Sequence, residues 1–309
     1  MSDLTKSKIR EILEQIFFFA VVVFIFWLIF KKVPVQKVLV ALKKVEPVRF
    51  FSLSFIFVWT SLALDSFIHY FLFNKFQIKI NYKDMFEVRL ASMLLGSLGF
   101  VYGQGGLSWL VSRETKRPIA EVVGLLAFLF FNTFFSAVLF ALIAGGVFLP
   151  KAGGEKIYFK IFPALLGGVV LFFIWLVFWK SRFKNKIPLR LRKGILYGFD
   201  QAPVKRYFQL IALRTIWFLI LSTFVWLAMP AIDIHIEFKV LASLIPVLGI
   251  IIAFPTPGRY GTHEGGYLLL FSNWADGSKL VAFALLWGTS ANILRAIFSL
   301  LAVRRYRKK

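Results

Sequence analysis

The sequence has 309 residues, of which 59% are hydrophobic, and carries a net charge of +23. This hydrophobic content exceeds that of a soluble domain, so we predict an integral membrane protein whose basic loops face anionic lipid head groups rather than nucleic acid. The sequence contains no cysteine, which excludes disulfides, thiolate metal ligands and a cysteine nucleophile.

Six stretches are apolar and close to the roughly 20 residues that a helix needs to cross a bilayer. The first follows basic residues, as a signal peptide would, but no small-residue cleavage site comes after it, so we predict that it is retained. The predicted fold class is all-α, a polytopic membrane protein with a single transmembrane domain over residues 1–309. Its full spans are predicted at residues 12–30, 50–73, 119–149, 161–179, 208–230 and 280–302.

Two further apolar stretches, residues 88–112 and 239–272, are predicted to form re-entrant helical hairpins. The first arm of each would be about 24 Å long as a helix, against a hydrocarbon core of about 30 Å. Each arm then runs into glycines or prolines, and such breaks persist in a membrane only when they are buried in protein or line a wet cavity. Both hairpins contain "LAS", at Leu90 and Leu241, which leaves open an inverted repeat of the kind found in transporters.

Charge favours one orientation for the C-terminal half of the chain. Loop 180–206 and the C-terminal tail are rich in Lys and Arg, so we expect both in the cytoplasm and the chain in the cytoplasmic membrane. For the N-terminal half, two re-entrant hairpins place the N-terminus in the cytoplasm and loop 31–49 outside, whereas a crossing first hairpin reverses both. The short arms favour the first arrangement. The "LRLRKGILYGF" stretch is open to two interpretations, an interfacial helix or a solvated loop.

The segment "FPTPGRYGTHEGG", residues 254–266, is the strongest candidate for a binding site. We expect Thr262 to cap a helix that begins at His263, so that free N–H groups and Arg259 together attract an anion, most naturally a phosphate. Glu264 needs a partner at this depth, either Arg259, His263 or a group of the substrate. A pair between Arg259 and Glu264 that only closes the hairpin is the alternative. The predicted substrate-binding residues of this segment are Gly258, Arg259, Gly261, Thr262, His263 and Glu264.

The second span carries Ser61, Asp65 and His69 on one face. These residue types suggest a catalytic triad, but they extend over about 12 Å of helix instead of converging, so a polar stripe that faces other helices is favoured. No catalytic residue is therefore predicted. Asp65 is a predicted binding residue that requires a cation, for which the candidates are Arg214, Arg259 and Arg295.

The last span carries Gly288, Asn292, Arg295 and Ser299 on one face. Arg295 is predicted either to contact substrate or to extend to the membrane surface. Arg89, at the start of the first hairpin, is expected to anchor lipid head groups. The sequence has no P-loop, no dinucleotide fingerprint and no metal-ligand spacing, so no cofactor and no metal are predicted.

The layout of spans resembles the transmembrane region of lysylphosphatidylglycerol synthase, the flippase half of multiple peptide resistance factors. The late motif of that family is similar to P-x-x-x-G-x-G-x-R-E-G. Matching positions here are Pro255, Gly261, Glu264 and Gly265, with His263 where the family usually has arginine.

An earlier family motif, P-G-x-x-G-E followed by arginine, is represented by Gly103, Gly106 and Arg113 alone. The Glu-Arg…Asp signature of the next span is missing, and Asn132 is the polar residue there. The resemblance implies movement of a lipid between leaflets, or help to an enzyme that makes a lipid-linked product. Because the soluble aminoacyl-transferase domain of the full synthase is absent, we do not expect the chain to make lysylphosphatidylglycerol itself.

The resulting expectation is a flippase-like protein that binds and translocates an anionic phospholipid or lipid-linked head group. Two alternatives stay open. One is a membrane-embedded lipid-modifying enzyme with Glu264 or His263 as general base. The other is a scaffold subunit for a membrane glycosyltransferase or lipid synthase. Expected partners are membrane phospholipids, with a homo-oligomer or a lipid enzyme as further candidates.

Overall fold

The structure, a computed structural model, describes residues 20–98, 100–254 and 256–306. No strand occurs in this part of the chain, and five of its helices are long and apolar enough to cross a membrane, which confirms the all-α, polytopic fold. The first predicted span lies largely outside the described residues, of which 20–32 are helical. The five long helices are α3 (Pro47–Lys75), α6 (Ile119–Phe148), α7 (Glu155–Lys180), α10 (Val204–Ala228) and α13 (Gly277–Tyr306).

Prolines mark where three of these helices begin. Pro47 is the first residue of α3, while Pro118 and Pro203 immediately precede α6 and α10. The first turn of a helix does not use its own N–H groups, so proline costs nothing there and prevents the preceding chain from continuing as helix. The starts of these spans are therefore encoded locally.

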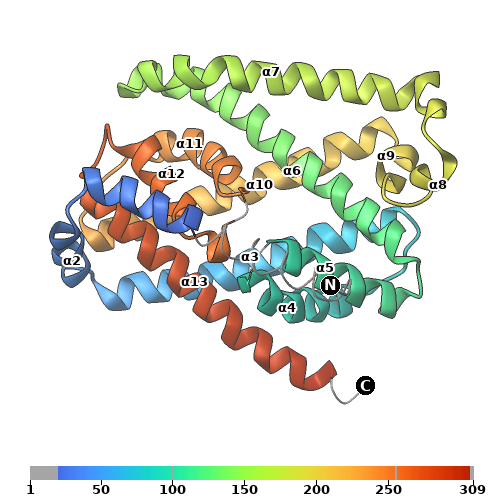
Figure 1. Cartoon of the computed structure of the whole chain (residues 1–309), viewed down its shortest axis with the longest axis horizontal. Helices are drawn as coiled ribbons and strands as arrows, with labels where there is room; N and C mark the ends of the chain where they lie inside the picture. The colour runs from blue at the N-terminus through green and yellow to red at the C-terminus, as the bar shows by residue number, and fades with distance from the viewer. Residues whose placement is uncertain (1–19, 99, 255, 307–309) are drawn as a thin grey trace, which may run out of the picture.

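The connections between helices gather at two opposite ends of the bundle (Figure 1). One end carries α2 (Val35–Lys43), and beside it the backbone N–H of Glu46 donates to the carbonyl of Ala231 at 2.8 Å. The other end carries α9 (Tyr197–Gln201). We call them the α2 end and the α9 end.

The first hairpin consists of α4 (Tyr82–Leu98) and α5 (Phe100–Thr115), which pack along each other. Arg117, beyond α5, donates through Nη2 to the carbonyl of Gln77, before α4, at 3.2 Å. The hairpin therefore starts and finishes at the α9 end, as expected for a hairpin that does not cross the bundle.

The second hairpin consists of α11 (Phe238–Ile251), the single turn η4 (Pro257–Arg259) and α12 (Thr262–Phe271). Lys279, beyond α12, donates through Nζ to the carbonyl of Asp233, before α11, at 3.0 Å. This hairpin starts and finishes at the α2 end, so the two hairpins enter the bundle from opposite ends. The turn η4 contacts α4, so the broken tip of the second hairpin reaches the first hairpin.

Loop 31–49 lies at the α2 end with loop 230–240, as the contact between Glu46 and Ala231 shows. Loop 180–206, which we call the basic loop, lies at the opposite end (Figure 1). Of the two arrangements considered for the N-terminal half, the helices therefore follow the one in which both hairpins return.

The basic loop does not form one interfacial helix. It folds into short turns, η2 (Arg182–Lys186), α8 (Leu189–Arg192) and α9. One carboxylate joins them, because Asp200 Oδ1 lies 3.0 Å from Lys184 Nζ and 3.5 Å from Arg192 Nη1. The loop is thus a compact cap on the α9 end rather than a continuous helix.

The apolar core is divided into two clusters, one toward each end of the bundle. On α3, Phe57 and Val58 belong to the cluster at the α2 end, and Ile68 belongs to the cluster at the α9 end. The helices α6, α10 and α13 also contribute to both clusters. Between the clusters these helices carry polar side chains, which we call the polar layer: Asp65 on α3, Ser136 on α6, Arg214 on α10 and Arg295 on α13.

Candidate functional site

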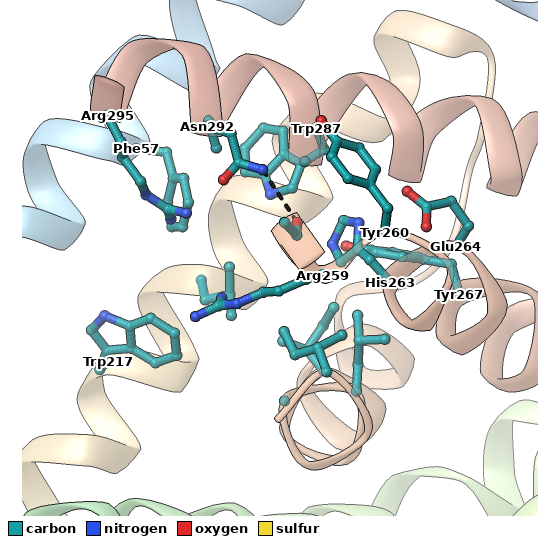
Figure 2. Close-up of a pocket in the computed structure, with 18 residues that line it drawn as sticks. Phe57, Trp217, Arg259, Tyr260, His263, Glu264, Tyr267, Trp287, Asn292 and Arg295 are labelled. Carbon is teal, nitrogen blue, oxygen red and sulfur yellow. Dashed lines mark hydrogen bonds between the residues drawn. The ribbon is translucent and has the colours of Figure 1, made fainter. Parts of the chain in front are cut away.

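A cavity of about 90 Å³ adjoins the polar layer. It lies between the second hairpin, α10 and α13 (Figure 2). A cavity of this size holds several water molecules or one small polar group, and not a whole lipid. Its polar lining includes Arg259, Tyr260, His263, Glu264, Asn292 and Arg295, together with the indole of Trp217.

The break between α11 and α12 holds Arg259 in an unusual backbone conformation. The φ angles of Gly258, Arg259 and Gly261 are 60°, 64° and 82°, a region that glycine enters freely and arginine rarely. Two side chains secure it: Thr262 Oγ1 donates to the carbonyl of Arg259 at 3.0 Å, and Asn292 Nδ2 donates to the carbonyl of Gly258 at 3.3 Å. The surrounding structure thus fixes the backbone from which the Arg259 side chain extends along the cavity (Figure 2).

The predicted helix cap at Thr262 is wrong by one residue. The helix α12 begins at Thr262, and Gly261 is the residue that precedes it. The backbone N–H of Gly261 donates to Glu264 Oε2 at 2.6 Å. Glu264 closes the start of the helix because the Thr262 hydroxyl is already bonded to Arg259. The helix end that was expected to receive a substrate anion therefore holds a carboxylate of the chain itself.

Glu264 is fully buried, yet among the described residues neither Arg259 nor His263 pairs with it, so two of its three predicted partners are not found. Its Oε1 has no hydrogen-bond partner in that part of the chain. The guanidinium of Arg259 points away from Glu264 (Figure 2). His263 Nδ1 instead lies 3.1 Å from the carbonyl of Ala284 on α13. The interpretation in which Arg259 and Glu264 merely close the hairpin is therefore wrong.

Arg295 lines the cavity from α13 and is half-buried. Neither Arg295 nor Arg259 forms an ion pair with any described residue. Both guanidinium groups point into the same space (Figure 2). Two arginines that have no carboxylate partner within residues 20–98, 100–254 and 256–306 form an environment that favours an anion.

The other residues on the same face of α13 join the helix to both hairpins. A Cβ on Gly288 would lie 3.3 Å from His263 Nδ1, so glycine permits this close approach to the second hairpin. Ser299 accepts the backbone N–H of Leu94 at 2.8 Å and donates to the carbonyl of Leu90, both in the first hairpin. The polar face of the last span is therefore largely structural, and Arg295 is its exception.

Asp65 lies outside the cavity lining, in an ion-pair cluster of its own. Arg214 Nη1 donates to Asp65 Oδ1 at 2.7 Å, which confirms one of its three predicted partners and not Arg259 or Arg295. The second partner, Arg89 Nη2, donates to Asp65 Oδ2. The prediction that Arg89 anchors head groups is wrong, because α4 begins earlier than predicted and directs Arg89 toward α3.

The two residues that flank Asp65 on α3 also bind neighbouring groups. Trp217 Nε1 donates to Ser61 Oγ at 3.3 Å, and His69 Nδ1 lies 2.7 Å from the backbone carbonyl of Asp65. His69 Nδ1 also lies 3.6 Å from Asp65 Oδ2, but Ser61 bonds Trp217 instead of these two residues. The three side chains therefore do not form a triad, and the stripe faces other helices, as the sequence favoured.

The cavity thus brings together five of the predicted binding residues and omits three. Gly261 packs against the helix of residues 20–32, where its Cβ would lie 3.2 Å from Ile25. Thr262 is buried beneath the loop, and Asp65 is paired elsewhere. Across the described ranges, no group of three His, Asp or Glu side chains could hold a metal ion. The predicted residues that line the cavity are Gly258, Arg259, His263, Glu264 and Arg295.

Comparison with known protein families gives a match over residues 15–299 to the family described as the lysylphosphatidylglycerol synthase TM region. The chain belongs to this family. Membership in the lysylphosphatidylglycerol synthase TM region family indicates a membrane protein with a lipid-related function. No curated protein matches the chain.

Proposed function

We propose that this protein binds an anionic phospholipid or lipid-linked head group and moves it between the two leaflets. The observation that carries the proposal is the pair of arginines, Arg259 and Arg295, that point into one cavity without an acidic partner among the described residues. A charge inside the membrane is costly unless it is paired, so two unpaired arginines favour a ligand that supplies negative charge. A phosphate suits the planar guanidinium because it accepts two parallel hydrogen bonds.

The dimensions of the cavity support entry of a head group alone. A volume of about 90 Å³ accommodates a phosphate or a few waters, so acyl chains would remain in the surrounding bilayer. The buried apolar lining of the cavity belongs to the cluster at the α2 end, and its arginines face the polar layer, where a head group in transit needs polar contacts. We further propose the cytoplasmic membrane as the location, with the basic loop at the α9 end facing the cytoplasm and its anionic lipids.

The test is translocation of a fluorescent phosphatidylglycerol in vesicles that contain the purified protein, read by quenching of the label in the outer leaflet. One charge-assisted hydrogen bond contributes about 2 kcal/mol, so Arg259→Gln and Arg295→Gln are each expected to slow translocation by roughly 30-fold. The matched control is Arg190→Gln, an exposed arginine of the basic loop, which should translocate as the unsubstituted chain does. Unchanged rates in both cavity variants would remove the proposal.

The same vesicles separate transport from enzymatic modification. A translocating protein leaves the lipid chemically intact, so mass analysis of the recovered lipid should show one species. A new lipid species that requires Glu264 would support the membrane-embedded enzyme instead.

A further inference from the structure

The Asp65 cluster contains more positive charge than Asp65 needs. Arg214 alone would neutralise the carboxylate, but Arg89 also binds it, so one negative and two positive charges leave a net charge of +1. The three side chains are mostly buried, with 13%, 8% and 15% of the Asp65, Arg214 and Arg89 side chains exposed. A purely structural ion pair between helices would require only one arginine.

The hydrogen bonding of the cluster is also incomplete. Both carboxylate oxygens of Asp65 accept a guanidinium bond, and the Nε–H groups of Arg89 and Arg214 have no partner among the described residues. A buried donor without an acceptor is uncommon and costly. A carboxylate offers two oxygens, whereas a phosphate offers more, in a tetrahedral arrangement that can reach further donors. The donors around Asp65 therefore suit a phosphate better than they suit Asp65.

The cluster lies next to the cavity. Trp217 lines the cavity and bonds Ser61, which is one helical turn from Asp65 on α3. On the other side, Arg295 lines the cavity and lies within electrostatic range of both Arg89 and Asp65. Arg259 and Arg295 in the cavity, and Arg89 and Arg214 around Asp65, thus form two neighbouring pairs of cations.

We propose that Arg89 and Arg214 form a second anion-binding site, which Asp65 fills in this structure and which the phosphate of a head group takes from Asp65 during transport. The role in transport rests on the proposed function, but the existence of the site does not. The ligand class is a phosphate-bearing anion, whether a lipid head group or free phosphate.

The experiment replaces the resident carboxylate by its neutral isostere, Asp65→Asn, in the full-length purified protein. Thermal unfolding is measured in detergent with sodium phosphate and with sodium chloride at equal ionic strength. At phosphate concentrations about 100-fold above the dissociation constant, the melting temperature of Asp65→Asn should be about 5 °C higher in phosphate than in chloride. The unsubstituted chain should show a smaller difference, because Asp65 competes for the same arginines.

The matched control is Asp233→Asn, which removes an exposed carboxylate from Lys279 at the α2 end. Asparagine tolerates the φ of 57° at this position, so the backbone should be undisturbed. This variant should gain no more stabilisation from phosphate than the unsubstituted chain does. An equal gain in both variants would show a general salt effect and overturn the proposal, as would no gain in Asp65→Asn.

A second variant covers the case in which Asp65→Asn does not fold in chloride. The double variant Asp65→Asn with Arg89→Gln keeps the net charge of the natural cluster and should fold in either salt. Recovery of folded Asp65→Asn in phosphate only would support the proposal. Failure of Asp65→Asn in both salts, with the double variant folded in both, would show that phosphate does not satisfy the two arginines and would overturn it.

Two further arms identify the ligand and separate this inference from the proposed function. In lipid nanodiscs, stabilisation of Asp65→Asn by phosphatidylglycerol over phosphatidylcholine assigns the site to a lipid head group, and stabilisation by inorganic phosphate alone assigns it to the free ion. Adding Arg259→Gln to Asp65→Asn should leave the gain from phosphate intact. Loss of the gain would place the anion in the cavity instead of between Arg89 and Arg214 and overturn the proposal.

Discussion

Two neighbouring glycines of α5 should respond in opposite directions to the same substitution. Inside a helix, alanine is favoured over glycine by about 1 kcal/mol. A Cβ at Gly103 would lie 2.7 Å from the Cα of Gly96 on α4, whereas a Cβ at Gly105 meets nothing within 4 Å. Carbon atoms pack at about 3.5–4.0 Å, so Gly103→Ala forces the two arms of the first hairpin apart.

The magnitudes follow from these contacts. Overpacking costs about 1–3 kcal/mol, so Gly103→Ala should be destabilised by up to about 2 kcal/mol after the helical gain is subtracted. Gly105→Ala should be stabilised by up to about 1 kcal/mol. The two melting temperatures in detergent should differ by several degrees, at about 2–4 °C per kcal/mol. Equal shifts in the two variants would refute the close packing of α4 on α5.

Two other substitutions test single contacts. Glu264→Ala should destabilise the protein by about 0.5–2 kcal/mol because the Gly261 N–H loses its acceptor. Glu264→Gln should cost less, because its amide oxygen can accept the same hydrogen bond. Thermal unfolding of the two variants tests this, and a lower melting temperature for Glu264→Gln than for Glu264→Ala would contradict it. Outside the membrane-spanning helices, the hydrogen bond from Lys279 lowers the pKa of Asp233. The folded state then favours the ionised carboxylate, so this contribution to stability is present above about pH 4 and is lost as the pH falls below it. The difference in stability between Lys279→Gln and the unsubstituted chain should therefore shrink from pH 6 to pH 3, and a difference that stays the same over this range would count against the pair.

The spans and hairpins could be predicted from the sequence because their signals are local. A long apolar stretch bounded by prolines such as Pro118 and Pro203 indicates a helix whatever surrounds it. The break in the second hairpin was equally visible, since Gly258 and Gly261, which were predicted to interrupt the helix, lie in the break and adopt positive φ there. The arrangement of the first hairpin was not decided by charge. The contact between Arg117 and Gln77, which are distant in sequence, places both ends of this hairpin at the same end of the bundle.

The partners of buried charges could not be predicted in the same way. Asp65 clearly required a cation, and Arg214 was among the candidates, but nothing local distinguished it from Arg259 or Arg295. Arg89 was missed because its place depends on where α4 begins. A signal was present, since an arginine within the apolar arm of a predicted hairpin is itself in need of a partner.

The divided core constrains how the cavity can open. Because α3, α6, α10 and α13 each contribute to both apolar clusters, the two clusters cannot slide past one another as separate blocks. A change of shape at mid-height must instead flex the helices that pass through the polar layer. Ser136 is placed for this, since its hydroxyl bonds the carbonyl of Ile211 at 3.1 Å and Thr215 Oγ1 at 3.0 Å instead of packing in either cluster. The cavity would therefore open by bending of these helices at the polar layer, while the packing of the two apolar clusters is kept.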